Sequence, residues 1–323
     1  MVVIVRLKAP GGVEQLELAS ADLPPPGRGE VRLRQTAIGV NFIDIYQRMG
    51  LYALPPERIP GVEAVGVVAA LGSEVAGLEI GDRVAYAGAP VGAYASERNL
   101  PAWRCVKLPA AIPDEAVAAA LVKGITADML LTRVFPVGRG TTILVHSAAG
   151  GLGQLLTRWA DSLGATVIGT VGSPAKVETA RAAGASHVIV GRDADFAAAV
   201  ADLTAGRGVD VAYDGVGGTT LQKTLGCVRP FGVVASIGQS AGSIPLLDVN
   251  ELGPRRSLML ARPSVMAYMN DAGEYRRSAE RVLAAMADGV LQLTGRAYSL
   301  RDAALAQADL EAGRTTGALY MKP

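Results

Sequence analysis

The segment HSAAGGLGQ, residues 146–154, has the composition and spacing of a turn that holds phosphate groups. Ala148, Gly150 and Gly153 stand at the three glycine positions of a dinucleotide-binding fingerprint, and alanine is tolerated at the first if its φ is negative. The following helix would direct free N–H groups toward a pyrophosphate. The alternative is a tight turn without a ligand, but the preceding strand and following amphipathic helix favour dinucleotide binding. We expect the contacts to come from Ala149, Gly150, Gly151, Leu152 and Gly153.

The end of the next strand indicates which dinucleotide binds. An NAD site carries Asp or Glu about 20 residues beyond the third glycine, where the carboxylate holds the ribose 2′-hydroxyl. Here the strand ends in Gly172 and Ser173, with Lys176 following and no carboxylate. A hydroxyl and an ammonium suit a 2′-phosphate, so NADPH is favoured over NADH. Alternatively, Ser173 caps the next helix with Pro174 at its first position and Lys176 in solvent; this capping is compatible with phosphate binding.

The composition argues against several other functions. The chain has 323 residues, enough for about two domains, and its 31 basic and 30 acidic side chains leave a charge of +1, which argues against nucleic acid as the main partner. Cys105 and Cys227 match neither a disulfide framework nor a metal-binding spacing, which indicates a reducing compartment. No basic leader and no run of about 18 apolar residues occurs, so we expect a cytoplasmic protein without a membrane partner.

The elements that must position these residues fall into two groups. The first part of the chain predicts a small bent barrel of short strands, at 2–7, 30–40, 63–71, 82–88 and 92–98. An alanine-rich helical stretch follows from Asp114 to Arg133, and Gly124 is expected to interrupt it as a hinge.

From residue 141 strands and helices alternate, which is typical of a parallel sheet. The predicted strands are 142–146, 165–171, 187–190, 209–214, 232–238 and 257–263. Apolar residues from Leu152 to Leu163 recur at helical spacing and predict a face packed on the sheet. The final segments lose this alternation: a helix capped near Asn270, a capped helix from Ser299, and a last strand GALYM. We therefore expect the C-terminal part to return to the first domain, giving domains at 1–124 with 264–323, and at 125–263.

Together these residues resemble the zinc-independent quinone oxidoreductases, the zeta-crystallin-like branch of the medium-chain dehydrogenase/reductase superfamily. The resemblance covers nearly the whole chain. Its markers are GVNFIDIYQRMGLY at 39–52, GVEAVGVVAALG at 61–72, GDRV at 81–84, LVKGITAD at 121–128, AAGGLGQ at 148–154, ARPS at 261–264 and TTG at 315–317.

The resemblance implies an α/β protein with a Rossmann doubly wound parallel sheet and a GroES-like β-barrel catalytic domain built from both chain ends. It also implies NADPH as the cofactor and a homodimer or homotetramer. By resemblance, Asn41, Tyr46 and Tyr52 lie at the substrate side of the nicotinamide as hydrogen-bond donors, and Thr126 faces its carboxamide. The further cofactor contacts that it implies are Asn41, Phe42, Lys123, Gly191, Ile237, Gly238, Ser240, Arg262 and Arg314.

The resemblance also bears on a metal. The positions of the catalytic zinc ligands in zinc-dependent relatives are Asn41, Val62 and Lys123 here, and an amide, an aliphatic chain and an ammonium cannot form a tetrahedral zinc site. We expect no metal, and therefore an acceptor that takes hydride readily, such as a quinone or an activated alkene.

Each implied site residue also has a purely structural alternative. Tyr46 and Tyr52 would only pack their rings, Asn41 would form a turn and Lys123 would be solvated. Asp44 is expected to cap or orient its loop.

The sequence departs from the family pattern in three places. Val190 and Gly191 stand where Asn-Tyr is often found, so a tyrosine of the 2′-phosphate pocket is absent. Gly313 stands where an arginine is common, with Arg314 shifted by one, and Gly215 replaces a common serine.

The leading function is NADPH-dependent quinone reduction. A close alternative is reduction of the double bond of alkenals or enones, which also needs a proton donor for the α-carbon. A third is an NADPH-binding structural or RNA-binding crystallin-like protein, against which stand the near-neutral charge and the polar set Asn41, Tyr46 and Tyr52. The apolar strand SLMLARP, at the edge of the parallel sheet, predicts pairing with a second copy.

Overall fold

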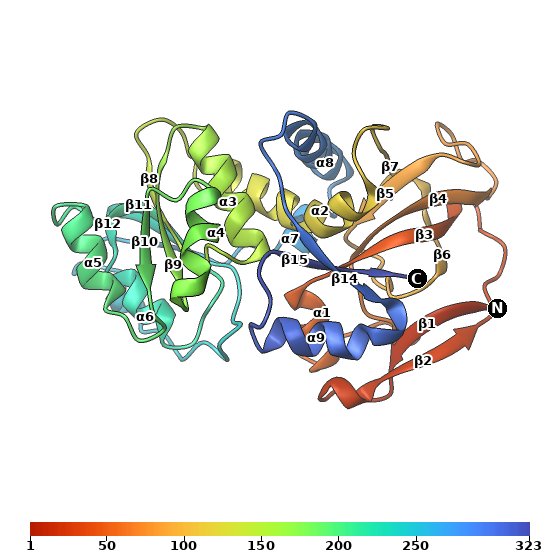
Figure 1. Ribbon diagram of the computed structural model, residues 1–323, viewed down its shortest axis with the longest axis horizontal. Coiled ribbons are helices and arrows are strands. Elements are labelled where there is room, and N and C mark those ends of the chain that lie inside the picture. The colour runs from red at the N-terminus through yellow and green to blue at the C-terminus, as the bar shows by residue number, and fades with distance from the viewer. The chain divides into compact units, whose positions relative to one another are not determined.

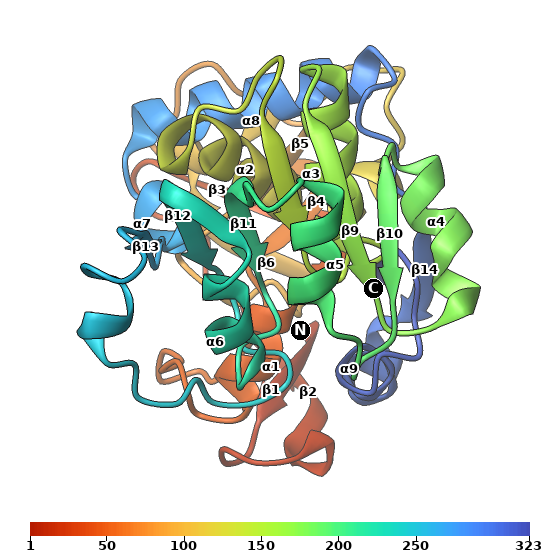
Figure 2. The ribbon, with the colours of Figure 1, turned by 90° about the vertical axis from the view of Figure 1, so that its left-hand side faces the viewer.

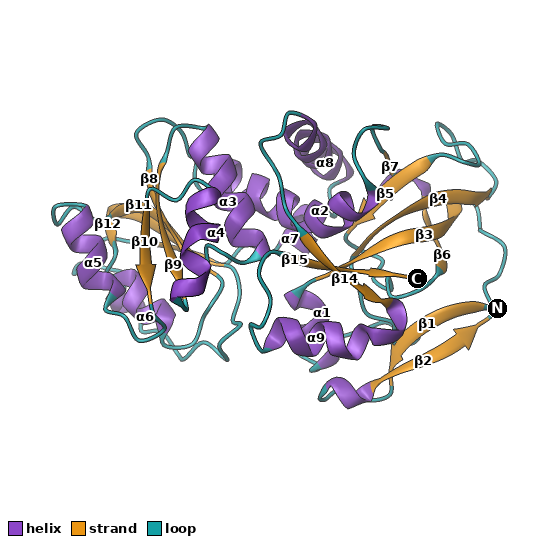
Figure 3. Ribbon diagram, in the orientation of Figure 1, coloured by secondary structure: helices purple, strands orange, loops and turns teal.

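The computed structural model describes residues 1–323 and forms two compact units (Figure 1). One comprises Met1–Ile125 and Met266–Pro323, and the other comprises Thr126–Val265. Strands predominate in the first unit, and strands alternate with helices in the second (Figure 3). This is the expected division between a barrel-like sheet and a parallel α/β sheet.

The first unit contains a hairpin and a bent, mostly antiparallel sheet, in which β14 and β15 pair in parallel. The hairpin pairs β1 (Val2–Leu7) with β2 (Leu16–Ala21), and the sheet has the order β14-β15-β3-β4-β5-β7, with β6 paired to β3. The sheet strands are β3 (Glu30–Val40), β4 (Glu63–Leu71), β5 (Arg83–Ala87), β6 (Glu97–Pro101), β7 (Val106–Lys107), β14 (Gly295–Ser299) and β15 (Ala318–Lys322). The pairing of C-terminal β15 with β3 confirms that both chain ends build this unit.

Five α-helices belong wholly or partly to this unit: α1 (Phe42–Arg48), α2 (Asp114–Met129), α7 (Val265–Tyr268), α8 (Ala272–Ala287) and α9 (Ala303–Glu311). The expected interruption of the helix at Gly124 is wrong, because α2 continues through Gly124 to Met129 and a π-helical turn then covers Leu130–Val134. Gly124 serves close packing instead: a Cβ there would lie 2.7 Å from Cγ1 of Val282 on α8.

The second unit is a six-stranded parallel sheet with the order β10-β9-β8-β11-β12-β13. Figure 2 shows these strands side by side, with α4 next to β10 at one edge. The strands are β8 (Thr142–Val145), β9 (Thr166–Val171), β10 (His187–Val190), β11 (Val209–Asp214), β12 (Val228–Ser236) and β13 (Met259–Ala261). The helices include α3 (Gly151–Ser162), α4 (Val177–Ala182), α5 (Phe196–Leu203) and α6 (Thr220–Leu225).

The predicted periodicity of α3 places Leu155, Leu156 and Ala160 in the core, but Leu163 is exposed because the helix ends at Ser162. Two predicted strands are shorter or displaced. Strand 257–263 is only Met259–Ala261, since Ser257 has a φ of +53°, and segment 92–98 becomes extended in the sheet only from Glu97.

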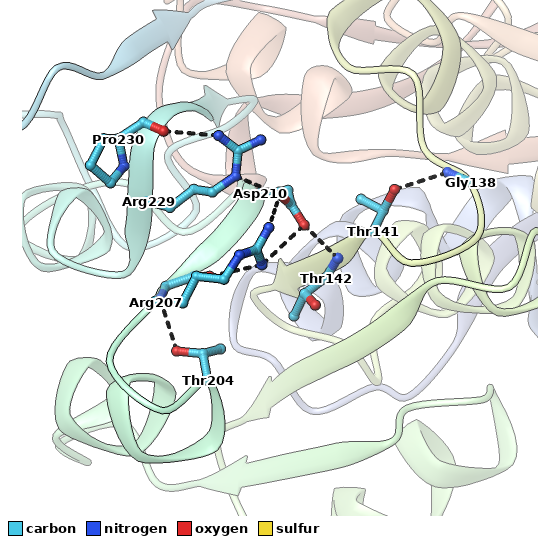
Figure 4. Close-up of polar contacts among 9 residues, drawn as sticks. Gly138, Thr141, Thr142, Thr204, Arg207, Asp210, Arg229 and Pro230 are labelled. Atoms are coloured by element: carbon cyan, nitrogen blue, oxygen red, sulfur yellow. Dashed lines mark hydrogen bonds and ion pairs between the residues drawn. The ribbon is translucent and has the colours of Figure 1, made fainter.

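A buried carboxylate ties together the amino ends of three strands of the parallel sheet (Figure 4). Asp210 on β11 accepts hydrogen bonds from Arg207 at 2.6 Å, from Arg229 on β12 at 2.6 Å and from the backbone N–H of Thr142 on β8 at 2.8 Å. Burial acts to raise the pKa of Asp210, but these donors outweigh it and lower the pKa. Asp210 is therefore an ionised carboxylate that connects neighbouring strands of the sheet.

Gly124→Ala should destabilise the protein because β-branched Val282 has little freedom to move away from a new Cβ. We expect a net loss of about 1–2 kcal/mol in the free energy of unfolding, after the helix propensity that alanine gains over glycine. Urea denaturation measures it. Gly138→Ala is the matched control, because no atom lies within 4 Å of a Cβ at that position. Equal stability of the two variants would contradict the packing role of Gly124.

Candidate functional site

In the first unit, an amide, an ammonium and a carboxylate form one hydrogen-bonded cluster. Asn41, the N-cap of α1, donates from Nδ2 to Oε1 of Glu63 at 2.8 Å and accepts at Oδ1 from Nζ of Lys123 at 2.7 Å. The Lys123 and Glu63 charges are 3.6 Å apart, and the Lys123 side chain is only 12% exposed. The alternative of a solvated Lys123 is therefore wrong, whereas Asn41 also forms the capping box at the start of α1.

Glu63, the first residue of β4, is the part of this cluster that the sequence did not reveal. Its carboxylate is wholly buried, and its Oε2 also accepts from the backbone N–H of Val122 at 2.7 Å. Gly39 on β3 makes room for it, because a Cβ there would overlap the Glu63 carboxylate. Burial raises the pKa of Glu63, while Lys123 and the hydrogen bonds from Asn41 and Val122 counteract that rise.

Asp44 supports the same helix start from the third position of α1. Its Oδ2 accepts from the backbone N–H of Asn41 at 2.9 Å and from the hydroxyl of Tyr94 at 3.0 Å, which agrees with the expected capping role. Asp44 is fully buried, and burial raises its pKa from 3.8 to about 7. The folded state therefore favours a protonated Asp44.

Three aromatic rings follow Asn41 on α1 and the next turn. The rings of Tyr46 and Tyr52 meet edge to face with centroids 5.8 Å apart, and Phe42 lies 6.3 Å from Tyr46. Tyr52 is 44% exposed, so ring packing and a hydroxyl available to a ligand are compatible there. The structure thus brings together Asn41, Phe42, Tyr46, Tyr52 and Lys123 within this unit, and their roles as donors or cofactor contacts remain predictions.

In the second unit, the glycine turn between β8 and α3 has the geometry of a phosphate cradle. Gly150 is the N-cap of α3 and no side chain caps the helix, so the first-turn N–H groups are open to a ligand. Gly153 has no room for a Cβ, which would lie 2.8 Å from Cα of Ala148. Alanine is accepted at the first fingerprint position because the positive φ, +55°, falls on Ser147.

Beneath this turn lies His146, which the sequence analysis did not single out. Its Nδ1 is 3.1 Å from the hydroxyl of Thr170 and its Nε2 is 2.9 Å from that of Thr224. Because the Thr224 hydroxyl donates to the carbonyl of Thr220, it must accept from His146, which places the proton of the neutral ring on Nε2. Burial lowers the pKa of His146, so a neutral imidazole braces the turn.

The end of β9 carries the residues expected at the 2′-phosphate. Ser173 is an N-cap with Pro174 following, but its side chain makes no capping bond. Arg192 lies against Gly172, since a Cβ at Gly172 would be 3.5 Å from both Cγ and Nε of Arg192. Gly191 has a φ of +118°, which suits glycine better than the tyrosine of the family pattern. Two cations, Lys176 and Arg192, thus follow β9 and β10.

The other predicted cofactor contacts of this unit, Ile237, Gly238, Ser240 and Arg262, follow β12 and β13. Arg262 donates to the Ser236 hydroxyl at 2.7 Å. Carboxyl ends of parallel strands share one edge, so these residues lie at the edge of the glycine turn. Thr126 lies near the start of this unit. Arg314, in the first unit, is paired with Asp309 at 2.7 Å.

Two further observations concern metals and membranes. No group of three or more His, Cys, Asp or Glu side chains is placed to hold a metal ion. No helix has the length and apolar character that crossing a bilayer requires.

A GroES-like sheet with a polar cluster and a Rossmann sheet with a glycine turn define a medium-chain dehydrogenase/reductase. Residues 27–110 match the family described as alcohol dehydrogenase GroES-like domain, and residues 151–286 match the family described as zinc-binding dehydrogenase.

Similar proteins narrow the class. A 2-haloacrylate reductase of Burkholderia is 39% identical over 100% of this chain and 99% of its own. A quinone oxidoreductase of Pseudomonas aeruginosa is 38% identical over 99% of each chain. The crystal structure of Escherichia coli quinone oxidoreductase complexed with NADPH has a TM-score of 0.96 and 35% identity, covering 99% of this chain and all of that one. The chain belongs to the zinc-independent quinone oxidoreductases of the medium-chain dehydrogenase/reductase superfamily.

The raised pKa of Asp44 predicts a pH-dependent stability. A carboxyl group whose pKa is higher in the fold than in the unfolded chain stabilises the fold below pH about 4, and this contribution is lost as the pH rises to about 7. Asp44→Asn removes the titration, so between pH 4 and 7.5 the unfolding free energy of wild type relative to this variant should fall by about 3–4 kcal/mol. Chemical denaturation at both pH values measures the change.

Asp210→Asn is the matched control, because the pKa of Asp210 is lowered and its contribution to stability must grow as the pH rises from the acid range. A difference between wild type and Asp44→Asn that does not change with pH would contradict a protonated Asp44.

Proposed function

We propose that this protein is an NADPH-dependent quinone reductase. The observation that carries the proposal is that one chain contains both kinds of site. In one unit an Asn41 amide is hydrogen-bonded to a Lys123 ammonium, and the other unit contains a phosphate-cradling turn. The similarity to quinone oxidoreductases over nearly the full chain supports a quinone as the acceptor. The residues expected as the catalytic domain are 1–124 with 264–323, and those of the dinucleotide-binding domain are 125–263.

The residues present fit NADPH. The uncapped start of α3 and the small residues Gly150 and Gly153 suit a pyrophosphate, while Lys176 and Arg192, with no carboxylate at the end of β9, suit a 2′-phosphate. The NADPH complex of the Escherichia coli relative supports the same cofactor. When bound, NADPH supplies a hydride.

The chain's own groups bind and orient the acceptor. Asn41 donates to the acceptor oxygen, on which negative charge develops, and Lys123 adds positive charge beside it. Tyr46 and Tyr52 form the aromatic wall that orients the ring, with the Tyr52 hydroxyl as a further donor. Orientation and hydrogen bonding together are sufficient for an acceptor that takes hydride readily.

A second candidate is reduction of activated alkenes, favoured by the similarity to 2-haloacrylate reductase. Alkene reduction needs the same hydride and also a proton for the α-carbon. Tyr52, whose side chain is partly exposed, is the candidate donor of that proton.

We also propose a cytoplasmic homodimer or homotetramer that pairs through the edge of the parallel sheet. β13 is the edge strand, Met259 on it is 52% exposed, and Phe231 beside it on the β12 segment is 73% exposed. An uncovered apolar edge of this kind favours pairing with a second copy.

An acceptor panel distinguishes the two reactions. NADPH oxidation with 1,4-benzoquinone and 1,4-naphthoquinone should proceed with a kcat/KM at least about tenfold above that with 2-alkenals or 2-chloroacrylate, since a quinone needs no proton on carbon. A preference for the alkenes would favour the second candidate, and no turnover of any acceptor would contradict both.

Dialysis against a chelator should leave the rate of NADPH oxidation near its starting value because Asn41, Val62 and Lys123 are not zinc ligands.

Lys176→Ala should weaken NADPH binding by roughly 10- to 150-fold, because it removes a hydrogen bond to a charged phosphate group. NADH, which lacks this phosphate, should bind within about twofold of its wild-type affinity. Arg192→Ala should act in the same direction, and the double variant should be non-additive because both cations meet one phosphate. Fluorescence titration measures the affinities. Lys107→Ala, which removes a surface lysine paired with Asp82 in the other unit, is the control. Equal weakening of NADH and NADPH would contradict the assignment of this pocket.

A further inference from the structure

Only one orientation of the Asn41 amide is compatible with its neighbours. An ammonium can only donate hydrogen bonds and a carboxylate can only accept them. Oδ1 of Asn41 lies 2.7 Å from Nζ of Lys123, and Nδ2 lies 2.8 Å from Oε1 of Glu63. Reversing the amide would place donor against donor and acceptor against acceptor. Glu63 and Lys123 therefore fix the amide from both ends.

This orientation leaves one defined donor. Nδ2 of Asn41 has two N–H bonds, of which one goes to Glu63, and the contacts of the cluster provide no acceptor for the other. The Lys123 ammonium is engaged with Asn41, with the carbonyl of Val40 at 3.4 Å and with Glu63 at 3.6 Å. The free N–H therefore belongs to Asn41, and it lies beside a positive charge that strengthens it as a donor.

The Glu63 carboxylate that accepts from the Asn41 amide is itself held in a fixed orientation. The N–H of Val122 at the other oxygen fixes its orientation, and the missing side chain of Gly39 leaves the space it occupies. A well-packed apolar residue at this wholly buried position would avoid the cost of desolvating a charge. The carboxylate instead holds an amide that lies next to the aromatic residues of α1.

We propose that Glu63 is a positioning residue for the reduction and acts through Asn41. It sets the amide so that the free N–H of Nδ2 donates to the carbonyl oxygen of the acceptor. This inference rests on the proposed function, because it names which atom of the chain meets the oxygen on which charge develops.

The test is a double-mutant cycle between Glu63 and Asn41. Glu63→Gln must set an N–H against either Val122 or Asn41, so kcat/KM for 1,4-naphthoquinone should fall about 10- to 100-fold. Asn41→Ala should cost at least as much, and adding Glu63→Gln to it should lower kcat/KM by less than about twofold further. The dissociation constant of the quinone for the NADP⁺ complex should show the same coupling. Glu63→Asp, which keeps the carboxylate, should recover part of the loss.

Asp210→Asn is the matched control, since it removes a buried, hydrogen-bonded carboxylate from the other unit and should lower thermal stability without changing kcat/KM. If Glu63→Gln does not fold, Glu63→Asp replaces it in the cycle, because the shorter side chain draws the carboxylate away from the amide and its smaller loss should show the same coupling. Equal losses with and without Asn41 would overturn the proposal.

Failure of the proposed function is distinguishable. If wild type turns over no acceptor, the reductase proposal fails, and the quinone dissociation constants of the same four proteins decide the positioning role. Coupled losses in those constants support it, and additive losses or none overturn it.

Discussion

The Glu63 carboxylate has no contact with solvent, so the protein must replace the hydrogen bonds that water would provide. Its donors come from two other elements, Asn41 at the start of α1 and the backbone of Val122 in α2, and its space comes from Gly39 on β3. One buried charge thereby ties β3, β4, α1 and α2 together at a single point. Movement of α1 or α2 would remove at least one donor from this buried carboxylate, which is a larger cost than the loss of one ordinary hydrogen bond.

The polar groups of the parallel sheet are paired differently at the two ends of its strands. At the amino ends of the strands Asp210 is fully paired with Arg207, Arg229 and Thr142, which is a structural arrangement. At the carboxyl ends the helix start at Gly150 is left uncapped, and the turn is braced from below by neutral His146. Backbone N–H groups that remain unpaired at a rigid strand end are available to a ligand. The hydrogen bonds at the amino ends thus stabilise the sheet, while the N–H groups at the carboxyl ends stay available for binding.

Local patterns predicted the parallel sheet, the glycine turn and the return of the C-terminal strand, because these depend on periodicity and turn chemistry within short segments. The errors arise where distant residues decide. Gly124 reads as a break until Val282 of α8 is seen to need its missing Cβ. For Lys123 the sequence left a solvated helix position open as an alternative, which only its partners Asn41 and Glu63 exclude. Glu63 itself gave one signal, a carboxylate opening an otherwise apolar strand, EAVGVVAAL.

Under the proposed function, the polar cluster also constrains the kind of acceptor that can be reduced. A metal stabilises a developing oxyanion by direct coordination, whereas an amide N–H beside an ammonium does so by a hydrogen bond strengthened by nearby charge. The hydrogen bond provides less stabilisation, so the acceptor itself must contribute more of the driving force. A quinone does so because its ring becomes aromatic on reduction, while an isolated carbonyl gains nothing comparable. In the proposed role, the arrangement of Asn41, Lys123 and Glu63 suits an acceptor that needs orientation and modest charge stabilisation rather than strong activation.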